Sequence, residues 1–211
     1  MIHFHTWKTP NGRKVGIMLE ETGLPYQVHP VDLMANEQFE PDFLAISPNN
    51  KILAIVDHEP GRPDLSLFES GAILSYLADK SGTLLSASGP ARWATLKWLY
   101  WSIGGVGPML GQLNFFVVRS DEKSPLAIDR FRKEGERLLR VLETELADHP
   151  YLGGEDYSIA DIASYPWVEE ARTAMAKPLS DAFAASPAIA DWLARVSERP
   201  AVKKGMRILE S

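Results

Sequence analysis

A short polar segment, Lys8-Thr9-Pro10-Asn11-Gly12, has the residue types that hold a negatively charged sulfur atom at the start of a helix. Thr9 is a typical N-cap residue, Pro10 suits the first helical turn, and Asn11 adds a side-chain amide. A hydroxyl and an amide there would donate hydrogen bonds to a thiolate, and the helix dipole would lower the pKa of the thiol. A well-capped helix without a ligand explains the same residues, so this segment alone leaves both interpretations open.

The segment Glu69-Ser70-Gly71 is a second candidate site, between a predicted strand at 64–68 and a predicted helix at 70–80. Ser70 is a typical N-cap, and a helix that starts there directs backbone N–H groups and the positive end of its dipole at a ligand carboxylate. We expect Glu69 to be buried beside it, where its carboxylate would favour a ligand ammonium. The pair predicts a small anionic peptide with both charges. The alternative is an ordinary N-cap on a packing helix.

Size and charge exclude several classes of function. With 211 residues, 45% hydrophobic and 24% charged, the chain is typical of a globular protein with one large or two small domains. Its net charge of -6 argues against general nucleic-acid binding, which needs a basic face. No apolar run approaches the ~20 residues of a membrane span, and no leader pattern opens the chain. We therefore expect a cytoplasmic protein with no nucleic-acid or membrane partner.

The chain contains no cysteine, which excludes a thiol nucleophile or a redox dithiol of its own. If the protein performs sulfur chemistry, the sulfur belongs to the ligand. The histidines lack metal-binding spacing, so we expect no metal site and interpret them as surface or strand-end residues. They are His3, His5, His29, His58 and His149.

The first eighty residues predict an α/β domain of the order β-α-β-α-β-β-α with a mixed four-stranded sheet. Crossover helices make parallel pairs, whereas the short turn at Pro60–Pro63 makes an antiparallel one. The loops at 7–13, 49–53 and 69–70 should converge at one edge of this sheet, where α/β proteins bind ligands. The expected strands are 2–6, 26–33, 52–57 and 64–68, and the expected helices are 11–23, 39–46 and 70–80.

After Gly82 the pattern becomes helical, with a linker at 86–90. Ser158 and Asp161 form a capping box. The six tryptophans suit core packing better than a pocket, because aromatic residues at helical spacing are usually core. The expected helices are 91–116, bent at the glycines of 104–108, then 126–147, 158–168, 187–196 and 201–209.

Five segments carry a resemblance to a known family: TPNG at 9–12, SPNNKI at 47–52, LFESGAIL at 67–74, GGVGPMLGQ at 104–112 and YLGGEDYSIAD at 151–161. The chain resembles the cytosolic glutathione transferases, and among them the bacterial nu-class, Ure2-like glutathione-dependent disulfide-bond oxidoreductases. The resemblance runs nearly end to end. It implies a thioredoxin-like domain at 1–82, an all-helical bundle domain at 88–211 and a two-fold homodimer.

The resemblance also implies roles for individual residues. Thr9 and Asn11 would face the sulfur of glutathione and hold the thiolate without a protein acid or base. Glu69 and Ser70 would hold the γ-glutamyl ammonium and carboxylate. The remaining implied residues are the backbone of Ile52 for the cysteinyl part, Lys51 and Gln38 for the glycyl end, Arg130 from the other subunit, and Trp7, Met109, Asn114 and Phe115 for the second substrate.

The implied activity is glutathione-dependent disulfide reduction, often with two glutathione molecules per site, with weak transferase or peroxidase activity and no metal. A non-catalytic glutathione-binding or regulatory protein on the same fold is the alternative. The family pattern has a cis-proline after Ile52, where this chain has Leu53. Because the residues on either side match the family, we expect the Ile52–Leu53 peptide to be cis.

Overall fold

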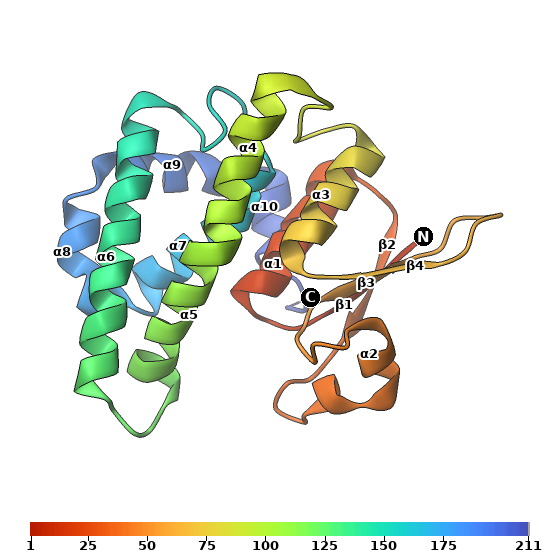
Figure 1. Cartoon of the computed structure of the whole chain (residues 1–211), viewed down its shortest axis with the longest axis horizontal. Helices are drawn as coiled ribbons and strands as arrows, with labels where there is room; N and C mark the ends of the chain where they lie inside the picture. The colour runs from red at the N-terminus through yellow and green to blue at the C-terminus, as the bar shows by residue number, and fades with distance from the viewer. Residues whose placement is uncertain (211) are drawn as a thin grey trace. The chain divides into compact units, whose positions relative to one another are not determined.

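In the computed structural model, which describes residues 1–210, the chain forms two units (Figure 1). Unit 1 is Met1–Leu85 together with the residues from Pro200 onward. Unit 2 is Ser86–Arg199, and its regular elements are all helices. The α/β unit followed by a helical unit is the fold class that the sequence predicts.

The C-terminal helix α10 (Pro200–Gly205) belongs to unit 1, although the expected boundaries place its residues in the helical domain. It packs against helix α1 (Pro10–Thr22). This contact needs glycine at position 205, because a Cβ atom there would collide with the backbone of Ile17. The last helix of the chain therefore helps to fix the helix that carries Thr9 and Asn11 at its start.

The sheet of unit 1 has the strand order β2-β1-β3-β4. The first two strands are parallel, and the β1–β3 and β3–β4 pairs are antiparallel, which confirms the predicted mixed sheet. Three strands are shorter than expected: β2 ends at Pro30, β3 begins only after Leu53, and β4 begins at Leu65. The bounds are β1 Ile2–Thr6, β2 Tyr26–Pro30, β3 Ala54–Asp57 and β4 Leu65–Phe68.

Helices cover both faces of this sheet. Helix α1 packs against α3 (Ser70–Ser81), and their buried side chains meet the strand residues Phe4 and Ile55 in the main core. On the opposite face, α2 (Pro41–Ile46) follows the short 3₁₀ helix η1 (Glu37–Phe39) and contacts β3 and β4. A small cluster forms there from Val31, Phe43 and Ala54, with Ile46 and Ile52 packed against it.

Four of the five histidines gather on the α2 face of the sheet, which their sequence spacing does not show. The parallel register places His5 opposite His29, and these rings stack with centroids 4.7 Å apart. His3 stacks on His29 at 5.0 Å and meets the ring of His58 edge-on at 4.7 Å. Burial and the neighbouring imidazoles lower the pKa of His5 to about 4. His5 is therefore neutral at pH 7.

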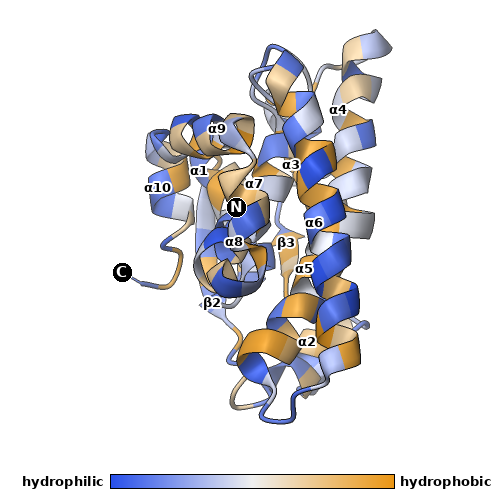
Figure 2. Ribbon diagram, turned by 90° about the vertical axis from the view of Figure 1, so that its left-hand side faces the viewer, coloured by the Kyte–Doolittle hydropathy of each residue, from blue (hydrophilic) through white to orange (hydrophobic). Residues whose placement is uncertain are grey.

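In unit 2, residues 91–116 were expected to form one bent helix. The structure shows alternating α- and π-helical segments there. In Figure 2, hydrophilic and hydrophobic residues alternate along the longest helix of this unit, α6, as expected for a helix with one buried side. One helix, α8, was not predicted. The bounds are α4 Gly89–Trp101, η2 Ser102–Val106, α5 Gly107–Asn114, η3 Phe115–Arg119, α6 Pro125–Asp148, α7 Ile159–Thr173, α8 Ala176–Ala184 and α9 Pro187–Ser197.

The predicted capping box at the start of α7 is present, with Ser158 as N-cap and Asp161 as its partner. Asp161 is fully buried and also accepts hydrogen bonds from the backbone N–H of Leu152 and from the indole of Trp192. Most tryptophans of unit 2 lie in the core as expected, whereas Trp93 is 67% exposed. Within residues 1–210, no helix combines the length and apolar composition needed to cross a bilayer.

Candidate functional site

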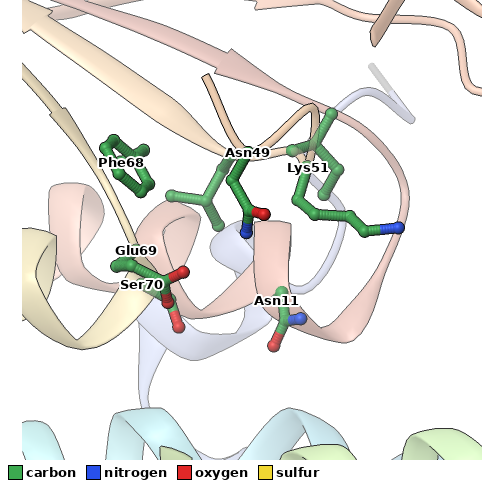
Figure 3. A pocket seen from close by; sticks show the side chains of 8 residues that line it. Asn11, Asn49, Lys51, Phe68, Glu69 and Ser70 are labelled. Carbon is green, nitrogen blue, oxygen red and sulfur yellow. The ribbon is translucent and has the colours of Figure 1, made fainter. Parts of the chain in front are cut away.

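A cavity of about 160 Å³ lies in unit 1 at the sheet edge where three loops were expected to converge. Figure 3 shows its polar side chains coming from the start of α1, the loop before β3 and the start of α3. The convergence predicted from the strand order is therefore confirmed. The lining residues are Asn11, Asn49, Lys51, Ile52, Leu53, Phe68, Glu69 and Ser70.

The start of α1 has the geometry predicted for it. Thr9 is the N-cap, and its hydroxyl oxygen accepts a hydrogen bond from the N–H of Gly12 at 3.2 Å. A threonine hydroxyl has two acceptor positions and one donor hydrogen, so this bond leaves the O–H as a donor. Asn11 lies in the first turn and lines the cavity, whereas Thr9 is not among the lining residues. The helix start thus offers a hydroxyl and an amide close together.

The start of α3 differs from the prediction in two respects. The N-cap is Glu69 rather than Ser70, which is already the first helical residue, and no side chain caps this helix. Glu69 has a positive φ of 73° and an exposed side chain, whereas we expected it to be buried. Glu69 follows β4, which is an edge strand of the sheet, and it lines the cavity.

The start of α3 nevertheless has the charge pattern that the sequence predicts. The first helical hydrogen bond runs from the N–H of Ile73 to the carbonyl of Glu69, so the N–H groups of residues 70–72 precede it. These groups and the positive end of the helix dipole favour a carboxylate, and the Glu69 side chain beside them favours a cation. The start of α3 can therefore bind both charges of an α-amino acid.

The loop before β3 forms the third side of the cavity. Lys51 and Ile52 line the cavity as expected, and the Ile52–Leu53 peptide is cis, as predicted. The Ser47 hydroxyl donates to the carbonyl of Lys51 at 2.9 Å, which holds the loop. In Figure 3 the Asn49 amide points toward the space in front of Glu69, and the Lys51 ammonium extends away from it.

Three lining residues, Asn49, Leu53 and Phe68, were not assigned to the site from the sequence. All three belong to segments that had been singled out, so their neighbours could have suggested them. Gln38, which was assigned, lies on η1 and is not among the lining residues.

The other assigned residues lie in unit 2, apart from Trp7 in unit 1, and have different environments. Arg130 and Phe115 are exposed. Asn114 is only 4% exposed, and its amide bonds to Glu170 and Arg119 within unit 2. This bonding gives Asn114 a structural role in unit 2.

One buried charged residue of the same region was missed by the sequence reasoning. Lys14 lies on α1 three residues after Asn11 and is 1% exposed. Burial lowers its pKa to about 7, although the charge of Glu69 acts in the opposite direction. The sequence feature that could have indicated this residue is a lysine in the middle of an otherwise apolar helix face, directly before Val15. Within residues 1–210, no group of three or more histidine or acidic side chains has a geometry that could hold a metal ion.

Comparison with known proteins agrees with this geometry. Residues 1–79 match the model of the glutathione S-transferase N-terminal domain, and residues 125–195 match that of the C-terminal domain. The disulfide-bond oxidoreductase YfcG of Escherichia coli is 49% identical over 98% of this chain and 94% of its own length.

Solved structures with the same fold contain glutathione or its disulfide. A glutathione transferase family member from Pseudomonas fluorescens, with two glutathione molecules bound, has a TM-score of 0.92 and 44% identity, covering 97% of this chain and 92% of its own. A glutathione transferase from Pseudomonas putida, with one glutathione disulfide per subunit, has a TM-score of 0.93 and 44% identity. The match covers 99% of this chain and 91% of that one. The chain therefore belongs to the glutathione S-transferase family.

Proposed function

We propose that the protein is a glutathione-dependent disulfide-bond oxidoreductase in which Thr9 and Asn11 hold the glutathione thiolate. The observation that carries this proposal is the start of α1, where the Thr9 hydroxyl keeps a donor hydrogen and Asn11 lines the cavity. The chain has no cysteine, so the attacking sulfur comes from the ligand. Glu69 and the N-terminus of α3 bind the γ-glutamyl ammonium and carboxylate.

The reaction consumes two glutathione molecules for each disulfide. The first thiolate attacks one sulfur of the disulfide, forms a mixed disulfide and releases the other sulfur as a thiolate that takes up a proton. A second glutathione thiolate attacks the mixed disulfide, which yields glutathione disulfide and the second free thiol. The relatives that hold two glutathione molecules or one glutathione disulfide support this stoichiometry. The same thiolate would give weak transferase and peroxidase activity.

The protein's own residues lower the pKa of the bound thiol rather than accept its proton. Hydrogen bonds from Thr9 and Asn11, together with the dipole of α1, favour the charged form of the sulfur. A preorganised donor at a developing charge costs no reorganisation during the reaction. Lys51 binds the glycyl end, and the backbone of Ile52 pairs with the cysteinyl part. The reduced glutathione that this reaction needs fits a cytoplasmic location.

Replacing Thr9 by alanine should lower the rate of disulfide reduction at least about tenfold, the scale of one hydrogen bond to a charged group. The loss should appear in kcat/KM for a small disulfide at saturating glutathione. Thr9→Ser keeps both the N-cap and the hydroxyl, and we expect it to retain most of the activity. If Thr9→Ala is folded and as active as the wild type, Thr9 has no part in the mechanism.

A non-catalytic glutathione-binding protein on this fold is the competing function. Calorimetry with glutathione and a disulfide-reductase assay on the same preparation separate the two functions. Binding with turnover supports the oxidoreductase, and binding without turnover supports the competing function.

We also infer a two-fold homodimer in which Arg130 completes the partner's site. Helix α4 has Trp93 and Tyr100 exposed at 67% and 66%, and large exposed aromatic residues are typical of interaction surfaces. The second substrate would bind near Met109 and Phe115 of unit 2. Light scattering at micromolar concentration should give twice the mass of one chain, and a monomer would contradict the dimer.

A further inference from the structure

Four histidines of unit 1 lie in contact across β1, β2 and the loop after β3, and we call His3, His5, His29 and His58 the histidine cluster. Nδ1 of His3 lies 2.8 Å from Nε2 of His29, which is a hydrogen bond between two rings. His5 stacks on the same His29 ring with centroids 4.7 Å apart. His58 meets His3 edge-on, and its Nδ1 lies 2.6 Å from the Asp64 carboxylate. The cluster therefore joins β2 to β1 through side chains as well as through the sheet.

This geometry limits the number of protons that the cluster can hold. A hydrogen bond between two imidazoles needs one ring nitrogen that donates and one that accepts. The His3–His29 pair can share one added proton, but a second would turn both facing nitrogens into donors 2.8 Å apart. The ring centroids of this pair are 5.0 Å apart, and His5 adds a third ring at 4.7 Å, so further positive charges would repel one another. The intact cluster therefore takes up fewer protons than four separate imidazoles would.

The strand on the other side of β1 offers no counter-charge to the cluster. In the antiparallel register, Val56 of β3 pairs with His3, and Ala54 pairs with His5. Both partners are apolar, and residues paired in this way point to the same face of a sheet. Burial, the neighbouring imidazoles and the N-terminal ammonium lower the pKa of His3, although Asp64 acts in the opposite direction. A charged cluster therefore gains no stabilisation from β3.

Carboxylates lie at both ends of the cluster. Asp64 faces His58 at one end, where the two side chains are 59% and 43% exposed. At the other end, three exposed acidic residues line a cavity together with His5, and they are Glu37, Glu40 and Asp42. Water and salt screen such exposed charges. Burial, together with the neighbouring imidazoles, lowers the pKa of His5 to about 4, so these carboxylates do not offset the cost of a proton there.

The strand that carries His29 is weakly anchored. β2 is an edge strand that pairs with β1, and all five of its residues are partly or fully exposed. Segments with little apolar burial open locally at a low cost in free energy. Opening of β2 separates His29 from His3 and His5, and each imidazole can then take up its own proton.

We propose that the histidine cluster is a pH-sensitive switch, which keeps β2 paired with β1 at neutral pH and releases it in mild acid. The direction follows from proton uptake. A free imidazole has a pKa of about 6.5, whereas the pKa values of His3 and His5 are lower in the cluster. The released strand therefore binds more protons than the paired one as the pH falls below about 6.5, and acid shifts the equilibrium toward release. This inference does not depend on the proposed function.

The test is hydrogen exchange of the β2 amides at pH 7.5 and pH 5.5, expressed as protection factors that correct for the intrinsic pH dependence of exchange. For one imidazole whose pKa changes from about 6.5 to about 4, the protection of β2 should fall about tenfold between these pH values. Carboxylates titrate mainly below this range, so their contribution is small. Equal protection of β2 at both pH values overturns the proposal.

Three variants identify the imidazoles that are responsible. His5→Phe keeps a flat ring beside His29 but cannot take up a proton, so the protection of β2 should fall less than about threefold over the same pH range. His29→Gln removes both ring contacts and should behave likewise if His5→Phe does not fold, because the comparison is made within each variant. His149→Gln removes a histidine outside the cluster, 44% exposed, and should keep the full fall. The full fall in a folded His5→Phe or His29→Gln protein would assign the effect to other groups and overturn the proposal.

Discussion

We expect the Glu69→Gln variant to bind glutathione about 10- to 150-fold more weakly than the wild-type protein, which corresponds to one hydrogen bond to a charged group. Glutamine keeps the size and the N-cap position but cannot compensate the γ-glutamyl ammonium. Because the Glu69 side chain is exposed and makes no capping hydrogen bond, its replacement should leave the folded structure intact. Isothermal titration calorimetry with glutathione gives the affinities directly.

The matched control is Glu40→Gln, another exposed glutamate at an N-cap position without a side-chain hydrogen bond, at the start of α2. It removes the same charge outside the cavity, so it should bind glutathione as the wild type does. Equal losses in both variants would mean that only the net charge matters. No loss in Glu69→Gln would show that the ligand ammonium binds elsewhere.

The Asp161→Ala variant should lose about 3–5 kcal/mol of unfolding free energy, because several buried donors lose their acceptor at once. The Asp161 carboxylate accepts hydrogen bonds from the N–H groups of Ser158 and Leu152 and from the Ser158 hydroxyl, at 3.0–3.1 Å. It also accepts one from the indole of Trp192 at 2.9 Å. A thermal melt followed by circular dichroism should shift downward by roughly 10 °C.

Two further variants test whether the loss of stability comes from removing the Asp161 acceptor itself. Burial raises the pKa of Asp161 despite its hydrogen bonds, so the neutral acceptor in Asp161→Asn should cost less than alanine. Asp156→Ala removes an exposed carboxylate from the same turn and should leave the melt unchanged. If Asp161→Ala also melts like the wild type, the network does not stabilise unit 2.

Local sequence signals determined the elements that carry the site. The start of α1 follows from Thr9 and Pro10, and its end follows from Gly23, which adopts a left-handed conformation. The capping box of α7 follows from Ser158 and Asp161. In each case the interacting groups lie within four residues of one another, so the chain does not need its tertiary structure to specify them. The order of strands and helices likewise indicated which loops meet at the cavity.

The tertiary structure decided the features that depend on distant partners. The histidines gather because the register of two parallel strands aligns them, and α10 returns to α1 because Gly205 permits close backbone contact. Glu69 occupies the N-cap position of α3 with an exposed side chain, directly after the edge strand β4. Lys14 is buried because of what surrounds α1, and no local propensity predicts the burial of a lysine there. Burial and charge compensation depend on residues far apart in the chain, and these contacts exist only in the folded protein.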